Sequence, residues 1–490
     1  MAFVLTMLYM AITFLSPGAL PSAVASLHVE IILGFLAILA TVTTVGGARL
    51  GQRPATYLVL GLLASTCVSM MATGWFGGAL QTFLGFVPSL ILYYFVAANC
   101  RSMWKQQVMV YTILLVAFYI IAQGGMAIRA DQVSSPWVVD ENGVLRLCGM
   151  GTIHDPNDTG QLFVMLIPLL WLRWKKGTAV GNVLFTMLPT AVLLFGLYLT
   201  HSRGDMIALV ALLMFALKDK LGVTGSAVLG ALTLVGIVAL NATGGRGITD
   251  DDGGRVAAWV TGLETFKSHF ILGVGPNNFN EYNPTGMTAH NSVILAMVEL
   301  GAVGFFFWMG SIVASWTELN WLAQKHQKSR LGPSSDLRRL EMATTLRDKT
   351  SPEVAALIEA PAGAPAMISA AMVRRAARMQ PRPIEPTNAW TPYRDITPLA
   401  DMDEEVTSEA LAWSAKVTRV SMVGLLVAGL FLSRTYSSSL YTLLGFSAAL
   451  VGLSHEDPPK DTRKLVVTTC VACVSSFILL YLFVRLHGVR

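Results

Sequence analysis

The sequence is poor in charged residues. Only 13% of its 490 residues are Asp, Glu, Lys or Arg, whereas a soluble domain carries about 25%. Hydrophobic residues make up 53% and the mean hydropathy is +0.57. These values exclude an ordinary water-soluble domain and predict a polytopic membrane protein. The formal net charge of +5 is too small to indicate nucleic acid as a partner.

Cysteine is also scarce, and a basic flank is missing at the start. The five cysteines, at positions 67, 100, 148, 470 and 473, form no recognisable disulfide framework. The C-x-x-C at 470–473 lies inside an apolar run, where packing explains it. Because no basic residues precede the first apolar run, we expect that run to be a retained helix rather than a cleaved signal.

Long apolar runs dominate the rest of the chain. We expect an all-α membrane fold of about 12–13 transmembrane helices, several of them shorter than the roughly 20 residues of a straight span. The runs are residues 3–20, 29–45, 55–73, 80–98, 108–122, 162–174, 180–200, 206–217, 222–240, 292–316, 417–432, 440–453 and 465–484.

Four regions follow from these runs. Residues 1–122 hold the N-terminal helices, and residues 123–316 form a core with long loops. Residues 317–416 mix charge with Pro/Ala stretches, which favours a largely disordered insert. An alternative for residues 365–379 is a short basic helix that binds anionic lipid or a partner. Residues 417–490 hold the last helices.

Lysine and arginine fall in alternate loops, and this asymmetry predicts the orientation. The basic loops should be cytoplasmic, as should the insert and the N-terminus. Residues 123–160, 201–205 and 241–289 are then extracytoplasmic. An odd helix count would put the C-terminus outside, although it carries Arg485 and Arg490.

A titratable side chain stands where a loop meets an apolar helix. Residues 273–289 are rich in Gly, Pro and Asn, and an apolar run starts at Ser292. Asn291 is a good N-cap candidate. The positive end of a helix disfavours a charged imidazole, so we expect His290 to be neutral and able to accept a proton.

Two arginines stand at the starts of predicted helices. In L-T-H-S-R-G-D, residues 199–205, Ser202 can cap a helix whose first turn holds Arg203. The helix dipole opposes a cation there, so an anion should lie nearby. Alternatively, Asp205 pairs with Arg203, or Arg203 reaches the lipid headgroups.

Arg255 follows a glycine pair and could form a bidentate contact with a phosphate. Apolar residues then recur at helical spacing, which predicts an amphipathic helix over residues 255–270 with Val256, Trp259, Leu263 and Phe266 on one face. The preceding acidic run, Asp250 to Asp252, could hold a divalent cation. Charge runs are usually solvated, however, and we predict no metal and no cofactor.

Further polar candidates come from two other segments. H-D-P-N-D, residues 154–158, opens a helix that Asn157 or Asp158 would cap. His154 either lines a site or ties the loop down. Glu299 lies inside an apolar helix, where a charge is costly. It either forms an ion pair with a buried arginine or has a function.

The order and spacing of these motifs resemble the O-antigen ligase and O-antigen polymerase superfamily. The resemblance rests on G-R-V-x-x-W at 254–259, G-V-G-P-N-N-F at 273–279, A-H-N-S at 289–292 and E-L-G-A-V-G at 299–304, with D-P-N-D and S-R-G-D upstream. It covers residues 152–316. The insert and a possible extra last helix depart from the usual pattern.

This resemblance implies a metal-independent glycosyltransferase at the outer face of the bacterial inner membrane. Its donor would be a glycan on undecaprenyl diphosphate, and its acceptor a glycan, lipid A-core or a protein. By position, His290 matches the family's essential histidine, and Arg203 and Arg255 match its diphosphate-contacting arginines. We predict that Asn291, His154, Asp158 and Glu299 also contact substrate.

Two alternatives remain open. A ligase and a polymerase share the donor chemistry and differ only in the acceptor. A flippase or other transporter would also have many helices and buried charges. Against it, no internal repeat is evident, and the polar residues gather at one predicted face rather than at mid-membrane.

Overall fold

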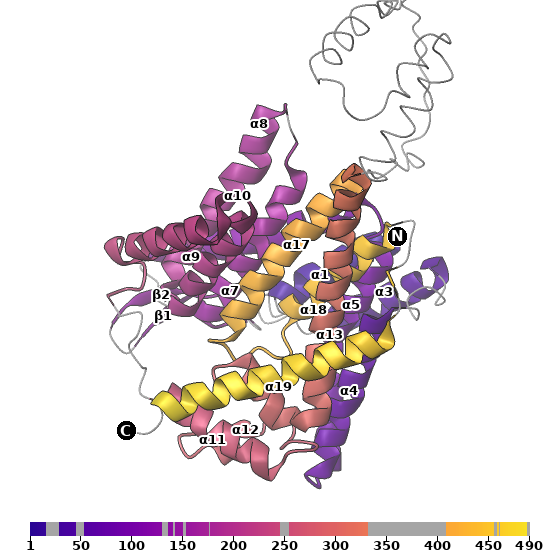
Figure 1. Ribbon diagram of the computed structural model, residues 1–490, viewed down its shortest axis with the longest axis vertical. Coiled ribbons are helices and arrows are strands. Elements are labelled where there is room, and N and C mark those ends of the chain that lie inside the picture. The colour runs from indigo at the N-terminus through magenta and orange to yellow at the C-terminus, as the bar shows by residue number, and fades with distance from the viewer. Residues whose placement is uncertain are drawn as a thin grey trace, which may run out of the picture. The chain divides into compact units, whose positions relative to one another are not determined.

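The chain folds almost entirely into helices (Figure 1). The computed structural model describes residues 1–15, 29–45, 53–129, 136–140, 143–149, 153–175, 177–245, 254–331, 408–454, 458–459 and 461–487. One compact unit comprises Met1–Lys325 and Val406–Arg490. All contacts below lie within this unit.

Helices occupy most of the predicted apolar runs. In chain order they are α1 (Ala2–Leu15), α3 (Val29–Val45), α4 (Pro54–Ala72), α5 (Phe76–Asn99), α6 (Met103–Arg129), α7 (Pro156–Leu169), η4 (Leu170–Arg173), α8 (Ala179–Asn182), η5 (Val183–Met187), α9 (Leu188–Thr200), α10 (Arg203–Ala239), α11 (Arg255–Ser268), α12 (Phe279–Tyr282), α13 (Ser292–Leu331), α17 (Ser408–Gly429), α18 (Ser438–Gly452) and α19 (Thr462–His487).

The described helices confirm an all-α, multi-pass membrane protein. Eight of them are long and apolar enough to cross a membrane, and three shorter apolar helices accompany them. The predicted runs 206–217 and 222–240 are two helical segments that fold back on each other, since a Cβ at Gly230 would lie 2.6 Å from Met214 Sδ. They form α10, which bends at Gly222, where φ is 69°. Glycine adopts this left-handed conformation without steric cost.

A small hairpin in the loop region after α6 was not predicted. Strands β1 (Trp137–Val139) and β2 (Leu145–Leu147) pair antiparallel, with Trp137 opposite Leu147. The Trp137 indole N–H donates to the carbonyl of Gly124 at 2.9 Å. The hairpin is therefore held against the end of α6.

Helix α17 is central to the packing of the unit. It packs against both α7 and α10, and α18 packs against α5 (Figure 1). The connection between α17 and α18, residues 430–437, is called the α17–α18 turn below. It reaches between α7 and α13, and the site forms around it.

Helix α13 is broken at Gly301, and the preceding loop fills the break. Gly301 has φ 63° and Gly273 has φ 72°. The N–H groups of Val274 and Gly275 donate to the carbonyls of Val298 and Glu299, at 3.0 Å each. Across the break, the N–H of Ala302 donates to the carbonyl of Phe270 at 2.7 Å. The loop thus satisfies backbone groups that the bend removes from the helix.

Close backbone approach explains both glycines. A Cβ at Gly301 would lie 2.4 Å from the carbonyl oxygen of Ile271, and one at Gly273 would lie 2.5 Å from that of Glu299. The motifs G-V-G-P-N-N-F and E-L-G-A-V-G are therefore two halves of one structural joint.

The two ends of the predicted insert are helical. Helix α13 continues to Leu331, and α17 begins at Ser408. The predicted disorder of the segment between them, and the possible basic helix at 365–379, lie outside the described residues.

Candidate functional site

His290 sits in a strained turn that is held by the hydroxyl of Ser433. Its φ is 46°, a left-handed conformation that is uncommon for a residue with a side chain. Its N–H donates to Ser433 Oγ at 2.8 Å, and Thr288 Oγ1 donates to the same oxygen at 2.7 Å. Strain of this kind persists only where the surroundings enforce it, and it is concentrated at functional sites.

Asn291 is the N-cap of α13, as predicted. Its Oδ1 accepts from the N–H groups of Val293 at 2.9 Å and Ile294 at 3.2 Å. The cap satisfies donors that the first turn of a helix leaves unpaired. His290 therefore directly precedes a capped helix N-terminus.

Arg255 is the first residue of α11, and this helix is held against the His290 turn. The Trp259 indole N–H donates to the carbonyl of Ala289 at 2.7 Å. A Cβ at Gly254 would lie 2.2 Å from Met287 Cε, so the helix start touches the same loop. Leu263 and Phe266 are buried, which agrees with the predicted amphipathic helix.

Arg203 is the first residue of α10, and its helix start packs against the α17–α18 turn. Ser202 is the N-cap, as predicted, and its Oγ accepts from the N–H of Asp205 at 3.4 Å. A Cβ at Gly204 would lie 2.6 Å from Phe431 Cβ. Arg203 is only 8% exposed, so it does not extend outward in the manner of a headgroup contact.

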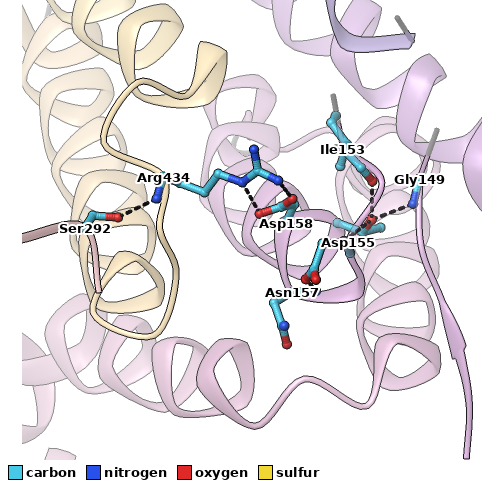
Figure 2. A network of polar contacts seen from close by, with 8 residues as sticks. Gly149, Ile153, Asp155, Asn157, Asp158, Ser292 and Arg434 are labelled. Carbon is cyan, nitrogen blue, oxygen red and sulfur yellow. Dashed lines mark hydrogen bonds and ion pairs between the residues drawn. The ribbon is translucent and has the colours of Figure 1, made fainter. Parts of the chain in front are cut away.

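The sequence predicts Asn157 or Asp158 as the N-cap of α7, and both predictions are wrong. The N-cap of α7 is Asp155, which accepts from the N–H of Asn157 at 2.7 Å. Asp158, 6% exposed in its side chain, instead forms a two-point ion pair with Arg434 from the α17–α18 turn (Figure 2). The Arg434 nitrogen outside this pair points away from the carboxylate.

Nothing in the sequence singles out Arg434, and nothing there indicates the contact between its backbone and Ser292. Its backbone N–H donates to Ser292 Oγ at 2.9 Å (Figure 2), and Ser292 Oγ donates to the carbonyl of Leu432 at 2.6 Å. Thr435 Oγ1 donates to the carbonyl of Ser292 at 2.9 Å. The α17–α18 turn is thereby fastened to the N-terminus of α13, next to His290.

A second arginine missed in the sequence, Arg146 of β2, joins two helix ends. Its Nε donates to the carbonyl of Thr200 at 2.9 Å and its Nη2 donates to Asn157 Oδ1 at 2.8 Å. Arg146 is 9% exposed. The hairpin therefore links the end of α9, just before Arg203, to the start of α7.

Glu299 is buried, and its carboxyl contacts two loops. Among the described residues, no ion pair with an arginine is found for it. Tyr436 donates its hydroxyl to Glu299 Oε2 at 3.1 Å, and the backbone N–H groups of Asn277 and Phe279 also reach the carboxyl. Burial and the neighbouring Glu299 raise the pKa of Tyr436 well above its usual value. Tyr436 therefore remains a hydrogen-bond donor.

The remaining candidates are His154 and the acidic run at 250–252. His154 is exposed, and none of the contacts described above involves its side chain. Asp250, Asp251 and Asp252 lie outside the described residues.

The N-termini of three helices therefore lie either at the α17–α18 turn or at the His290 loop that is bound to it. Helices α10, α11 and α13 begin at Arg203, Arg255 and Ser292. The contacts above join α10 and α13 directly to the α17–α18 turn, and α11 to the His290 loop, which is itself bound to Ser433. Helix N-termini carry partial positive charge and unpaired N–H donors, which suit an anionic ligand.

A polar cavity of about 540 Å³ borders the α17–α18 turn. Its walls come from the end of α4, the first half of α5, the segment 276–281 that leads into α12, and the turn itself. Ser433 and Arg434 belong to its lining, so the cavity adjoins the His290 loop.

Comparison with known families decides the identity of the core. Residues 188–309 match the model of the family described as O-antigen ligase. The chain carries an O-antigen ligase domain. That O-antigen ligase domain contains Arg203, Arg255, His290, Asn291 and Glu299, whereas Asp158 and Arg434 lie outside the matched stretch. The family transfers glycans as a ligase or polymerase, in agreement with the resemblance in the sequence motifs. No curated protein matches the chain.

Proposed function

We propose that this O-antigen ligase domain protein moves a glycan from undecaprenyl diphosphate to an acceptor hydroxyl at the extracytoplasmic face of the bacterial inner membrane. The observation that supports this proposal is that the starts of α10, α11 and α13 lie at the α17–α18 turn or at the His290 loop that is bound to it. Such a cluster suits a diphosphate leaving group.

The arginines have the role of stabilising that leaving group. As the bond between the anomeric carbon and the diphosphate oxygen breaks, negative charge grows on the diphosphate. Arg203 and Arg255 can form charge-assisted hydrogen bonds to it. Fixed donors in a site shielded from water stabilise such charge far better than bulk water does.

His290 has the role of general base. It takes the proton of the acceptor hydroxyl as that oxygen attacks the anomeric carbon, and undecaprenyl diphosphate leaves with the electron pair of the broken bond. General bases contribute about 10²- to 10⁴-fold to rate. Ser433 and Trp259 both hold the peptide group between Ala289 and His290, which supports a fixed backbone position for the residue that carries the imidazole.

The test compares His290→Ala with His269→Ala in a transfer assay using a lipid-linked glycan donor. His269 follows α11, and its Nδ1 lies 3.0 Å from Ser268 Oγ, outside the proposed site. We expect His290→Ala to lower turnover by about 100-fold or more, with His269→Ala close to wild type.

Near-wild-type turnover in His290→Ala would remove the proposed base. Movement of the lipid-linked glycan across the membrane by the wild-type protein, without any product, would instead favour a transporter.

A further inference from the structure

We propose that the cavity of about 540 Å³ beside the α17–α18 turn binds the sugar of the acceptor, and this inference rests on the proposed function. The volume is within the range of about 300–1,000 Å³ that small-molecule sites occupy. Among the residues that line the cavity, the side chains suited to contact a sugar are those of Trp75, Gln81, Thr82, Asn277, Glu281 and Ser433.

The cavity and the start of α10 contact different residues of the same turn. Phe431 packs against Gly204, next to Arg203, whereas Ser433 and Arg434 line the cavity. Ser433 also accepts the backbone N–H of His290, so the cavity wall is joined directly to the loop that carries the proposed base. The acceptor then enters from the α4–α5 side, and the diphosphate is held on the α10–α11 side.

The lining matches the chemistry of a carbohydrate. Sugar hydroxyls both donate and accept hydrogen bonds, and so do the amides of Gln81 and Asn277 and the hydroxyl of Thr82. Trp75 adds an aromatic ring, which offers a large apolar surface together with one donor. These walls do not suit an acyl chain, because the polar groups that it covered would lose their hydrogen bonds to water, and burying unpaired polar groups is costly.

Part of the cavity wall is fixed before any ligand arrives. Tyr436, which lines it, is tied to Glu299 at 3.1 Å, and Arg434 is tied to Asp158. Asn278 Nδ2 donates to the carbonyl of Val274 at 2.9 Å. A wall held in place by the protein lowers the ordering cost of binding. By contrast, Gln81 and Glu281 are exposed and can be replaced without disturbing the core.

The first experiment detects occupancy directly, without turnover. A single cysteine is introduced by Gln81→Cys, in the His290→Ala background, and its modification by a water-soluble maleimide is timed against the parent chain. Glu264→Cys on α11 is the matched control, because Glu264 is exposed and does not line the cavity. The two probes are oligosaccharide released from the surface polysaccharide of the host cell, and undecaprenyl diphosphate without a glycan.

We expect oligosaccharide to slow modification of the Gln81→Cys variant about tenfold at about ten times its dissociation constant, because only unoccupied protein reacts. Undecaprenyl diphosphate should have no effect, and the Glu264→Cys variant should respond to neither probe. Absence of protection by oligosaccharide, or equal protection by undecaprenyl diphosphate, would overturn the proposal. This measurement needs no turnover, so absence of protection would reject the acceptor cavity alone. Normal transfer by the His290→Ala variant would instead reject the proposed function.

A kinetic measurement separates the sugar of the acceptor from that of the donor. Loss of one or two hydrogen bonds in Gln81→Ala should raise the half-saturating acceptor concentration about three- to tenfold. The half-saturating donor concentration should stay unchanged. A rise for the donor alone would assign the cavity to the donor glycan and overturn the proposal.

Discussion

The two sides of the α17–α18 turn are built differently. On the α7–α10 side the turn is close-packed. Phe431 lies against Gly204, and Arg434 is paired with the buried Asp158 (Figure 2). On the α4–α5 side it borders a polar cavity of about 540 Å³, whose wall includes the exposed Gln81.

This difference shows which contacts stabilise the fold and which are available for a ligand. The packed side fixes the turn through side chains, by shape and by charge. The hollow side is supported from behind by backbone, where the 270–275 loop crosses the break in α13 at Gly301. The exposed side chains on the cavity wall, such as Gln81, can therefore vary with the ligand at little cost to folding, which is an arrangement suited to a change of acceptor.

The largest effect on stability is expected where backbone meets backbone behind the cavity. Gly301→Ala forces a side chain into a left-handed conformation, at φ 63°, and puts its Cβ 2.4 Å from the carbonyl oxygen of Ile271. Strained backbone costs about 1–3 kcal/mol and overpacking costs about as much again. We expect the free energy of unfolding in detergent to fall by about 3 kcal/mol or more.

Gly286→Ala separates the two contributions to that loss. Gly286 has a similar φ of 67°, but a Cβ there would meet nothing within 4 Å. Its substitution should cost only the strain of the left-handed backbone, which lowers the free energy of unfolding by about 1–2 kcal/mol. Equal losses in the two variants would mean that the joint between the loop and α13 adds no support to the hollow side.

A smaller loss is expected from breaking the ion pair on the packed side. Asp158→Ala leaves the Arg434 guanidinium without its carboxylate partner. Removing one partner of a fully buried pair costs about 3–5 kcal/mol. Because the side chain of Arg434 is 37% exposed, we expect about 2–3 kcal/mol in the same denaturation measurement.

The double variant Asp158→Ala with Arg434→Ala shows whether pairing is the cause. It should be more stable than Asp158→Ala alone, because no uncompensated charge remains. If the losses of the two single variants simply add, the pair is not coupled, and the packed side is held by shape alone.

Local features of the site could be predicted from the sequence, because they depend on residues a few positions apart. Ser202 and Asn291 cap their helices, and the helix from Arg255 has its apolar face where spacing placed it. In each case the relevant contacts lie within one or two helical turns, where the residue types settle the outcome.

Contacts between distant segments could not be predicted in this way. The partners Asp158 and Arg434 are 276 positions apart, and the residues next to Asp158 in the sequence indicate only a helix cap. Arg434 stands in a short polar segment with no motif around it, and nothing nearby in the sequence identifies its partner. Likewise, the bend at Gly301 becomes intelligible only when the loop at Gly273 is seen to fill it.

The smallest effect is expected at the floor of the cavity, where the two sides of the comparison meet. Tyr436→Phe removes the hydroxyl that donates to the buried Glu299 at 3.1 Å, and the carboxyl keeps the N–H groups of Asn277 and Phe279. Losing one of several donors to a buried group should cost about 1–2 kcal/mol. The matched control is Tyr94→Phe, since the Tyr94 hydroxyl has no hydrogen-bond partner among the described residues. That control should be neutral or slightly stabilising. If both variants are neutral, Glu299 is held by the backbone N–H groups alone, and the cavity wall at Tyr436 depends on backbone rather than on side-chain contacts.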